Sequence, residues 1–308
     1  MKKAIKKILN YFKHPKIILK VIMIKFFTYI LTDKFYIKLM YFISYNKRLN
    51  LKNPVTYNEK LQWLKLYDKN PLYTTLVDKY KVKEYVKNLI GPQYVVKLLG
   101  VWDNFDQIDF DKLPDKYVLK CNHNSGRIFI CEDKSKFNKQ KAKKIISKSL
   151  KINHYWHYKE WPYKNVEPKI IAEEYLVDES GVELKDYKFF CFNGEVKAMF
   201  IASDRSKGAT KFDFFDADFN RLDIKQHYPN SNKTYEKPKN FQLMIELAKI
   251  LSKGFPHVRI DLYNADGNIY FGEYTFNHFS GLEKFEPEIW DKIFGDWIDL
   301  SKIYCNGE

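Results

Sequence analysis

The stretch that decides the fold is residues 257–281, HVRIDLYNADGNIYFGEYTFNHFSG. Its segments VRIDLY and IYFGEYTF are rich in β-branched and aromatic residues and flank the turn-forming run 264–268, so the pattern predicts a β-hairpin. A tight turn brings Asp261 of the first strand beside Glu273 of the second. Arg259, two residues before Asp261, is expected on the same face, because side chains on a strand repeat every second residue.

The two carboxylates of this hairpin lie among apolar residues. Burying carboxylates is costly unless a positive group is bound beside them. A hard cation such as Mg²⁺, shared with phosphate oxygens, is the usual solution, and Arg259 is placed to neutralise a reacting anion. The alternative is a strand pair whose charges face solvent.

The composition favours a globular protein with an anionic partner. Of the 308 residues, 45% are hydrophobic and 17% aromatic, which excludes a disordered chain. The net charge of +15 favours a nucleotide, a nucleic acid, an acidic glycan or a lipid surface as the partner. Only five residues are Arg, fewer than a protein that reads a nucleic-acid groove usually carries, so we expect no nucleic-acid partner.

The four cysteines show no C-x-x-C spacing, which argues against a zinc site and a disulfide framework. Cys121, Cys131 and Cys191 lie in apolar, strand-like runs and are expected to be reduced core residues. The predicted compartment is therefore the cytoplasm.

The N-terminal segment 1–45 is long and basic. Its residues 17–31 are too short and too often interrupted by Lys to span a membrane comfortably. Lys residues interleave with Ile, Leu, Phe and Tyr throughout the segment, which predicts a helix lying on an anionic membrane surface, the inner face of the cytoplasmic membrane. The alternative is an amphipathic helix packed on the protein's own core.

The remaining pattern predicts an α+β fold, because strand pairs alternate with helices and hairpins dominate. A capping box, Thr56-x-x-Glu59, begins a helix, and a second helix is predicted from 72 to 88. Further helices are predicted at 138–151 and 240–254, and strands at 94–101, at 170–177 and on both sides of the turn 122–126. Hairpins are predicted at 186–204, around Asn193-Gly194, and at 211–224. We expect a basic segment 1–50, a helical subdomain 51–115 and a catalytic region 116–308, divided into a lid at about 116–175 and a metal-binding half at about 176–308.

Three polar features away from the hairpin favour a nucleotide site. Lys120 ends the strand YVLK and precedes the small polar turn 122–126, and a Lys beside exposed turn amides suits phosphates. The run 173–176 leaves a strand with backbone donors and acceptors that suit an adenine edge. Lys188 alternates with aromatic residues and is a candidate to point into a cleft, the alternative being a Lys that faces solvent.

The order of these elements resembles the ATP-grasp superfamily, and more closely the TupA-like ATP-grasp family of capsule and teichuronopeptide gene clusters. The resemblance covers about residues 49–285. The strings that carry it are LKNPVTYNEKLQWLKLYD, VDKYKVKEYV, DKLPDKYVLKCNHNSG, EWPYKNVEPKIIAEEYL, DYKFFCFNGEVK and VRIDLYNADGNIYFGEYTFNHFSGLEKF. It implies two α+β subdomains that grip ATP and Mg²⁺.

The resemblance also implies a role for each matching residue. Phosphate contacts would come from Lys79 and Lys120, the flexible loop over them from Asn122, Asn124, Ser125 and Gly126, the adenine hinge from Glu173, Glu174, Tyr175 and Leu176, phosphate or ribose support from Lys188, binding of the reacting acid from Arg259, and the metal ligands from Asp261, Glu273 and Thr275. Of these, Arg259 and Lys188 would be the catalytic residues. Three positions depart from the family pattern: Thr275 stands where Asn is common, Asn124 where Gly is usual, and Phe279 where a small residue is frequent.

Four histidines each have a functional and a structural interpretation. His278 and His123 are candidate bases for an incoming amine, or else hydrogen-bonded structural residues. The pair His154 and His157 lacks the helical context of a zinc motif.

Two functions follow. The resemblance implies an ATP-dependent carboxylate–amine ligase of bacterial cell-surface polysaccharide biosynthesis, which joins an acidic sugar or glycan acceptor to an amine donor through an acyl phosphate. The alternative is a glycosyltransferase or glycan-modifying enzyme of the same pathway, for which Asp216-x-Asp218 would supply the metal motif, unless the two residues belong to an exposed turn.

Overall fold

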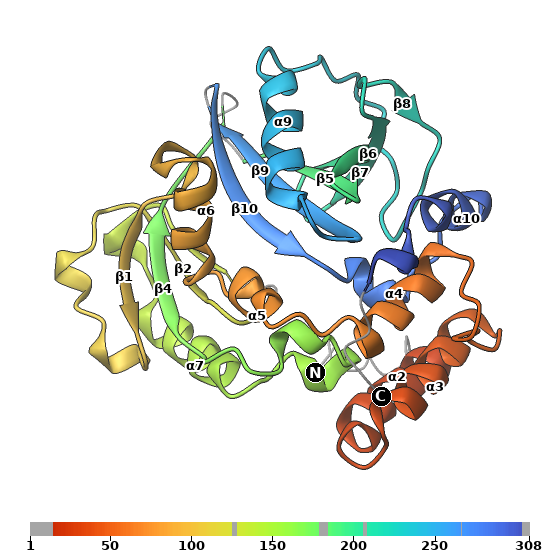
Figure 1. Cartoon of the computed structure of the whole chain (residues 1–308). Coiled ribbons are helices and arrows are strands. Elements are labelled where there is room, and N and C mark those ends of the chain that lie inside the picture. The colour runs from red at the N-terminus through yellow and green to blue at the C-terminus, as the bar shows by residue number, and fades with distance from the viewer. Residues whose placement is uncertain (1–14, 125–127, 179–183, 206–207, 266, 304–308) are drawn as a thin grey trace.

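The computed structural model describes residues 15–124, 128–178, 184–205, 208–265 and 267–303. Within them, two antiparallel sheets stand side by side, with helices around both (Figure 1). The large sheet has the strand order β10-β9-β5-β6-β7-β8, and the small sheet has the order β1-β4-β2-β3. This arrangement confirms the α+β prediction.

The large sheet contains the predicted hairpins. Its strands are β5 (Asp186–Phe192), β6 (Glu195–Ser203), β7 (Lys211–Asp216), β8 (Arg221–Leu222), β9 (His257–Ala265) and β10 (Asn268–Thr275). The register pairs Asp261 on β9 with Glu273 on β10 and with Lys188 on β5. The predicted neighbourhood of Asp261 and Glu273 is therefore confirmed.

Both faces of the large sheet are covered. Phe189 and Cys191 of β5 pack in one core with α9 (Phe241–Ser252), and Phe190 and Phe192 pack in another with residues of α4 (Tyr57–Tyr67) and α10 (Ile289–Asp296). Because alternate residues of a strand face opposite sides, this burial explains why β5 is apolar almost throughout. Lys188 has the same parity as Phe190, so the charged residues lie on the α4 and α10 face.

The small sheet consists of β1 (Leu98–Trp102), β2 (Tyr117–Cys121), β3 (Phe129–Cys131) and β4 (Ile170–Glu174). Tyr117 and Leu119 of β2 face the core that α7 (Lys139–Leu150) covers, so Lys120 points to the opposite side. β1 lies before the predicted boundary at residue 115, yet it pairs with β4, which lies after that boundary. The small sheet therefore contains strands from both sides of the predicted boundary.

The single helix predicted from 72 to 88 is wrong. The structure has α5 (Leu72–Val77) and α6 (Val82–Ile90) with a break between them. The buried Asp78 causes the break, because its Oδ1 accepts the backbone N–H groups of Tyr80 (2.9 Å) and Lys81 (3.3 Å) and starts a new turn. Lys79 therefore lies in the break between α5 and α6.

The N-terminal segment is also not one helix on a surface. It forms α2 (Pro15–Lys25) and α3 (Asp33–Tyr45), and residues 1–14 lie outside the described part. Tyr36 and Met40 of α3 are buried against Leu282, and the Tyr45 hydroxyl donates to the Glu283 carbonyl (3.1 Å). The alternative, packing on the protein's own core, is therefore correct for the buried face of α3. None of the helices seen in the described ranges is long and apolar enough to cross a membrane.

Several local predictions are confirmed. The capping box of Thr56 and Glu59 begins α4, and the thiols of Cys121, Cys131 and Cys191 are buried, whereas Cys305 lies outside the described residues. The short helices are α8 (Tyr155–Tyr158) and the 3₁₀ segments Phe27–Tyr29, Pro92–Tyr94, Phe105–Gln107, Phe110–Lys112, Lys134–Lys136, Trp161–Tyr163, His278–Gly281 and Leu300–Lys302.

Candidate active site between the two sheets

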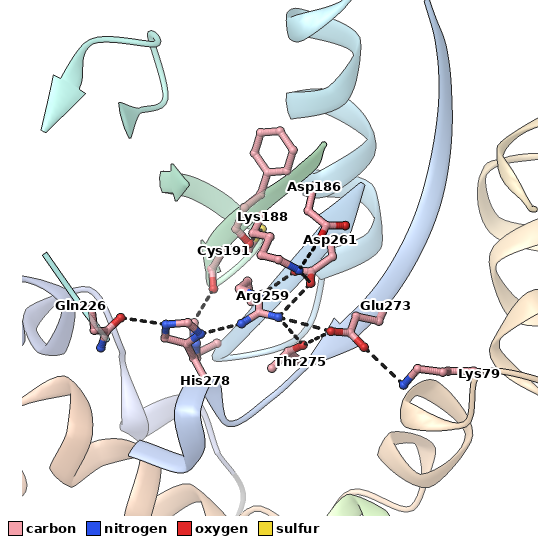
Figure 2. A network of polar contacts seen from close by, with 12 residues as sticks. Lys79, Asp186, Lys188, Cys191, Gln226, Arg259, Asp261, Glu273, Thr275 and His278 are labelled. Carbon is pink, nitrogen blue, oxygen red and sulfur yellow. Dashed lines mark hydrogen bonds and ion pairs between the residues drawn. The ribbon is translucent and has the colours of Figure 1, made fainter. Parts of the chain in front are cut away.

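A charged cluster is centred on the β9–β10 hairpin (Figure 2). Arg259 forks onto Asp261, with Nε 2.7 Å from Oδ1 and Nη2 2.8 Å from Oδ2. Its Nη2 also lies 3.4 Å from Glu273 Oε1. The three side chains therefore share one face of the sheet, as the strand period predicts.

Lys188 joins this cluster from β5. Its ammonium contacts the Asp261 carboxylate and lies 3.5 Å from Asp186 Oδ2. The Lys188 side chain is buried, so the alternative of a solvent-facing Lys is wrong. Asp186 was not predicted, although the spacing D-x-K already places it on the same strand face as Lys188.

Lys79 brings the break between α5 and α6 into the same cluster. Its Nζ lies 3.3 Å from Glu273 Oε2 and donates to the Asn124 carbonyl at 3.1 Å. One ammonium therefore touches both the hairpin of the large sheet and the loop that follows β2.

The charges of the cluster stabilise one another. Burial would raise the pKa of Glu273, but Lys79, Lys188 and Arg259 hold it well below its ordinary value. Burial would lower the pKa of Arg259, but Asp261 and Glu273 raise it. Burial raises the pKa of Asp261 despite Arg259 and Lys188 beside it. The Arg259 side chain is buried and that of Glu273 is 32% exposed, so their charges are held by one another at the margin of a buried site.

The donor set of the hairpin fits Mg²⁺. Asp261 and Glu273 supply two adjacent carboxylates, and the Thr275 hydroxyl, which accepts from Arg259 Nη2 at 3.0 Å, lies 3.5 Å from Glu273 Oε1. The described ranges contain no cluster of three or more His, Cys, Asp or Glu residues that would hold a metal by themselves. Two carboxylates are what Mg²⁺ uses when phosphate oxygens and water complete its shell.

A second charged group lies on the small sheet. Glu173 of β4 is buried, and its Oε2 lies 2.5 Å from Lys120 Nζ, while its Oε1 lies 2.8 Å from Lys83 Nζ on α6. Glu173 therefore faces two lysines. Sequence reasoning missed Lys83, whose signal is its place in the Lys-rich run VDKYKVK.

The loop after β2 is only partly described, since Ser125 and Gly126 lie outside the described residues. Asn122 is buried, and its amide donates to Asp78 Oδ1 (2.8 Å) and to the Glu167 carbonyl (3.0 Å). The Asn124 amide donates to Ser149 Oγ (2.7 Å). These side chains hold the loop in place, and contact with phosphate by its backbone stays a prediction.

The predicted adenine hinge leaves β4 at Glu174, the last residue of the strand. The Glu174 N–H donates to the Lys97 carbonyl (3.0 Å), and the Tyr175 hydroxyl donates to Glu132 Oε1 (3.0 Å). Tyr175 and Leu176 are partly exposed. Their role in binding adenine stays a prediction.

His278 is held on both sides of its ring. Its Nδ1 faces Arg259 Nη1 at 2.5 Å, and its Nε2 lies 2.8 Å from Gln226 Oε1. Because Arg only donates, Nδ1 accepts and the Nε2–H donates to Gln226. Burial and the Arg259 charge lower the pKa of His278 well below its ordinary value. No lone pair is left for a proton from an amine, so His278 fits its structural interpretation. His123 is also buried, with Nδ1 3.2 Å from Asn122 Oδ1, and burial lowers its pKa.

The two remaining motifs lie apart from the cluster. Asp216 caps its own turn, with Oδ1 accepting the N–H groups of Asp218 (2.9 Å) and Asn220 (2.8 Å), which fits the exposed-turn interpretation of the D-x-D match. The rings of His154 and His157 are 5.7 Å apart on and beside α8, and His154 lies 3.8 Å from Glu160.

Three of the solved structures that are similar to this chain have low sequence identity to it. D-alanine–D-alanine ligase from Bacillus anthracis, complexed with ATP, is 15% identical, with a TM-score of 0.37 over 66% of this chain and 54% of that one. The D-alanine–D-alanine ligase from Helicobacter pylori is 14% identical, with a TM-score of 0.40 over 80% and 68%. The ATP-grasp ligase PsnB, complexed with minimal precursor, Mg and ADP, is 11% identical, with a TM-score of 0.37 over 72% and 58%.

The chain thus spans little more than half the length of the Bacillus anthracis ligase and of PsnB. A search of curated proteins found no match. The model of the TupA-like ATP-grasp family, in contrast, matches residues 59–299, which include both sheets and every charged residue described above. This chain therefore belongs to the TupA-like ATP-grasp family and has the ATP-grasp fold.

Proposed function

We propose that this protein is an ATP-dependent carboxylate–amine ligase. The observation that carries the proposal is the Asp261–Glu273 pair, set among Arg259, Lys188 and Lys79 on one face of the large sheet. Membership of the TupA-like ATP-grasp family supports ATP as the nucleotide. Of the solved ligases named above, the Bacillus anthracis enzyme is complexed with ATP and PsnB with Mg and ADP.

In the proposed reaction, a carboxylate oxygen of the acceptor attacks the γ-phosphorus of ATP, and ADP leaves. An amine then attacks the carbonyl carbon of the acyl phosphate, loses a proton, and expels inorganic phosphate as the amide forms. Lys188, Lys79 and Lys120 would bind the phosphates, and Arg259 would hold the reacting acid. Mg²⁺ on Asp261 and Glu273, with Thr275 beside them, would share phosphate oxygens and offset the charge of the transferring group.

We further propose an acidic sugar or glycan as the acceptor and a small amine as the donor, in the synthesis of a bacterial surface polysaccharide. The net charge of +15 supports an acidic acceptor, because a cationic protein attracts anionic substrates. The cluster also supplies the Arg259 guanidinium, whose fork is held by Asp261 and whose positive charge would attract the acceptor carboxylate.

The test is a hydroxylamine assay with ATP, Mg²⁺ and a panel of uronic acids, in which an acyl phosphate is trapped as a hydroxamate. The wild type is expected to form hydroxamate with at least one acid. Asp261→Asn and Glu273→Gln should each abolish Mg²⁺-dependent turnover and keep the fold. Asp218→Asn, in the exposed turn, is the matched control and should retain turnover. Normal metal dependence in both hairpin variants would remove the proposed metal site.

We also propose that the protein works as a peripheral protein at the inner face of the cytoplasmic membrane. The connection between α2 and α3 supports this, since Phe26, Tyr29 and Ile30 are 63%, 65% and 77% exposed. On α3, a groove of about 280 Å³ combines an apolar floor with cations; it is lined by Phe35, Lys38, Leu39, Phe42, Arg48 and Leu49. Apolar side chains rimmed by cations suit a bilayer with anionic headgroups.

Vesicle flotation tests this location. Full-length protein should bind vesicles that contain phosphatidylglycerol, bind phosphatidylcholine vesicles poorly, and dissociate as salt rises. Phe26→Ser with Ile30→Ser should weaken binding at least about tenfold, since each apolar side chain buried contributes about 1.5–3 kcal/mol. Ile289→Ser, 55% exposed on α10, is the control. Equal binding to both vesicles at every salt concentration would contradict the proposal.

A further inference from the structure

The buried carboxylate of Glu173 contacts two ammonium groups, one more than its single negative charge neutralises. Lys120 Nζ lies 2.5 Å from Oε2, and Lys83 Nζ lies 2.8 Å from Oε1. Two ammonium groups and one carboxylate sum to a net charge of +1. A buried charge that its neighbours leave uncompensated is costly, so this group of three is prepared for a further anion.

The two lysines come from different parts of the fold. Lys120 and Glu173 are diagonal neighbours on β2 and β4 of the small sheet, where their direct partners are Ile171 and Val118. Lys83 belongs to α6, whose Val82 and Val86 pack in the core beneath the large sheet. Lys83 also donates to the Val96 carbonyl at 2.8 Å, which fixes its ammonium in place. The Lys83–Glu173 ion pair therefore connects the body of the large sheet to the sheet that carries Lys120.

Without Lys83, the net charge of this group would fall from +1 to zero. Glu173 would then form a closed, neutral pair with Lys120, and the Lys120 ammonium would be satisfied before any phosphate arrived. With Lys83 present, the two lysines share the negative charge of Glu173, so the Lys120 ammonium can still attract a second anion. Attraction of this kind is strong in a buried site, because little water screens it.

We propose that Lys83 is a positioning residue for ATP, which acts by sharing the Glu173 carboxylate so that Lys120 is available to the nucleotide phosphates. This inference rests on the proposed function, in which Lys120 contacts phosphate. It gives Glu173 the role of a counter-ion, in addition to its place before the hinge.

Calorimetric titration of ATP and adenosine into four variants tests the inference. Lys83→Met should weaken ATP binding about tenfold, the loss expected for weakening one charged hydrogen bond, and leave adenosine binding unchanged. Glu173→Gln, which removes the carboxylate charge and keeps the backbone of the predicted hinge, should bind ATP more tightly than the wild type. The double variant Lys83→Met with Glu173→Gln should regain ATP affinity, because the lone Lys120 again carries +1. Lys83→Arg should retain most of the affinity.

Lys87→Met is the matched control, since Lys87 lies one turn along α6 and pairs with Glu84 on the surface. The inference is overturned if the double variant loses as much affinity as Lys83→Met, or if Lys83→Met weakens adenosine equally. If Lys83→Met does not fold, the Glu173→Gln and Lys83→Arg results decide, and a large loss of ATP affinity in Glu173→Gln overturns the counter-ion role. A wild type that ignores ATP refutes the proposed function itself; a defect in Lys120→Met without one in Lys83→Met refutes only this inference.

Discussion

At the scale of the residue, Arg259 organises the candidate site through the number and directions of its donors. It contacts Asp261, Glu273, Thr275 and His278 at once, which a single ammonium does not do. These contacts fix the orientation of the carboxylates that would hold Mg²⁺. They also fix the tautomer of His278, which passes the hydrogen-bond chain on to Gln226.

His278 makes stability depend on pH in a predictable direction. The folded protein holds the ring neutral, with a lowered pKa, whereas the unfolded chain binds a proton below about pH 6.5. The unfolded state therefore binds more protons in acid, and the free energy of unfolding falls as pH drops below 6.5. His278→Gln keeps both hydrogen bonds and should reduce that slope by up to about 1.4 kcal/mol per pH unit. Urea titrations between pH 7 and 5 measure it; an unchanged slope would contradict the neutral ring.

At the scale of the element, the segment His278–Gly281 has a left-handed backbone that Phe and Ser rarely adopt. Phe279, Ser280 and Gly281 have φ values of 46°, 55° and 61°, in the left-handed region. Gln62 of α4 supports the segment, with Nε2 donating to the carbonyls of Ser280 (2.9 Å) and Gly281 (2.8 Å). The capping box that begins α4 thus contributes indirectly to the site, because α4 positions Gln62.

Gly281→Ala should therefore destabilise the protein more than an equivalent change elsewhere. A Cβ at Gly281 would lie 2.5 Å from Gln62 Nε2 and 3.2 Å from the Asn58 carbonyl, and the left-handed backbone adds strain. We expect a loss of about 2–3 kcal/mol in the free energy of unfolding, from strain of about 1 kcal/mol and weakened hydrogen bonds. Gly267→Ala has a similar φ and open space around it, so it should cost only about 1 kcal/mol. Equal losses in urea denaturation would refute the clash.

Elements that local sequence patterns specify could be predicted, whereas features that depend on contacts between residues far apart in the sequence could not. The hairpin of β9 and β10 and the start of α4 follow from turn residues and a capping box. The break at Asp78 follows only in part, because its local turn, in which Oδ1 accepts from Tyr80 and Lys81, is completed by a buried bond from the Asn122 amide, 44 positions along the chain. The same holds within the site. The strand period alone brings Arg259 and Asp261 together, whereas the meeting of Lys83 with Glu173 requires the packing of α6 beside the small sheet.

At the scale of the whole molecule, the N-terminal helices are part of the folded body. Lys159 is buried, and its ammonium donates to the Thr28 carbonyl (2.7 Å) and lies 3.2 Å from Asp33 Oδ1. The Tyr36 hydroxyl donates to the His157 carbonyl (2.8 Å). The segment that we propose to contact the membrane is therefore bound on its other side to α8 and to the loop after the candidate site.

Deletion of residues 1–45 should thus be far more damaging than deletion of residues 1–14. The longer deletion leaves the buried Lys159 without the Thr28 carbonyl and the Asp33 carboxylate, and loss of such partners costs about 3–5 kcal/mol. We expect a lower urea midpoint, or insoluble protein, for the longer deletion only. Equal stability of the two truncated proteins would mean that the N-terminal helices are an independent attachment.

The most direct test of the account is calorimetric titration of the full-length protein with ATP, ADP and UDP-glucose, each with and without Mg²⁺. The account predicts binding of ATP that Mg²⁺ strengthens, and loss of that Mg²⁺ effect in Asp261→Asn, while UDP-glucose gives no heat. Binding of UDP-glucose with no response to ATP would contradict the ligase proposal and favour a glycosyltransferase.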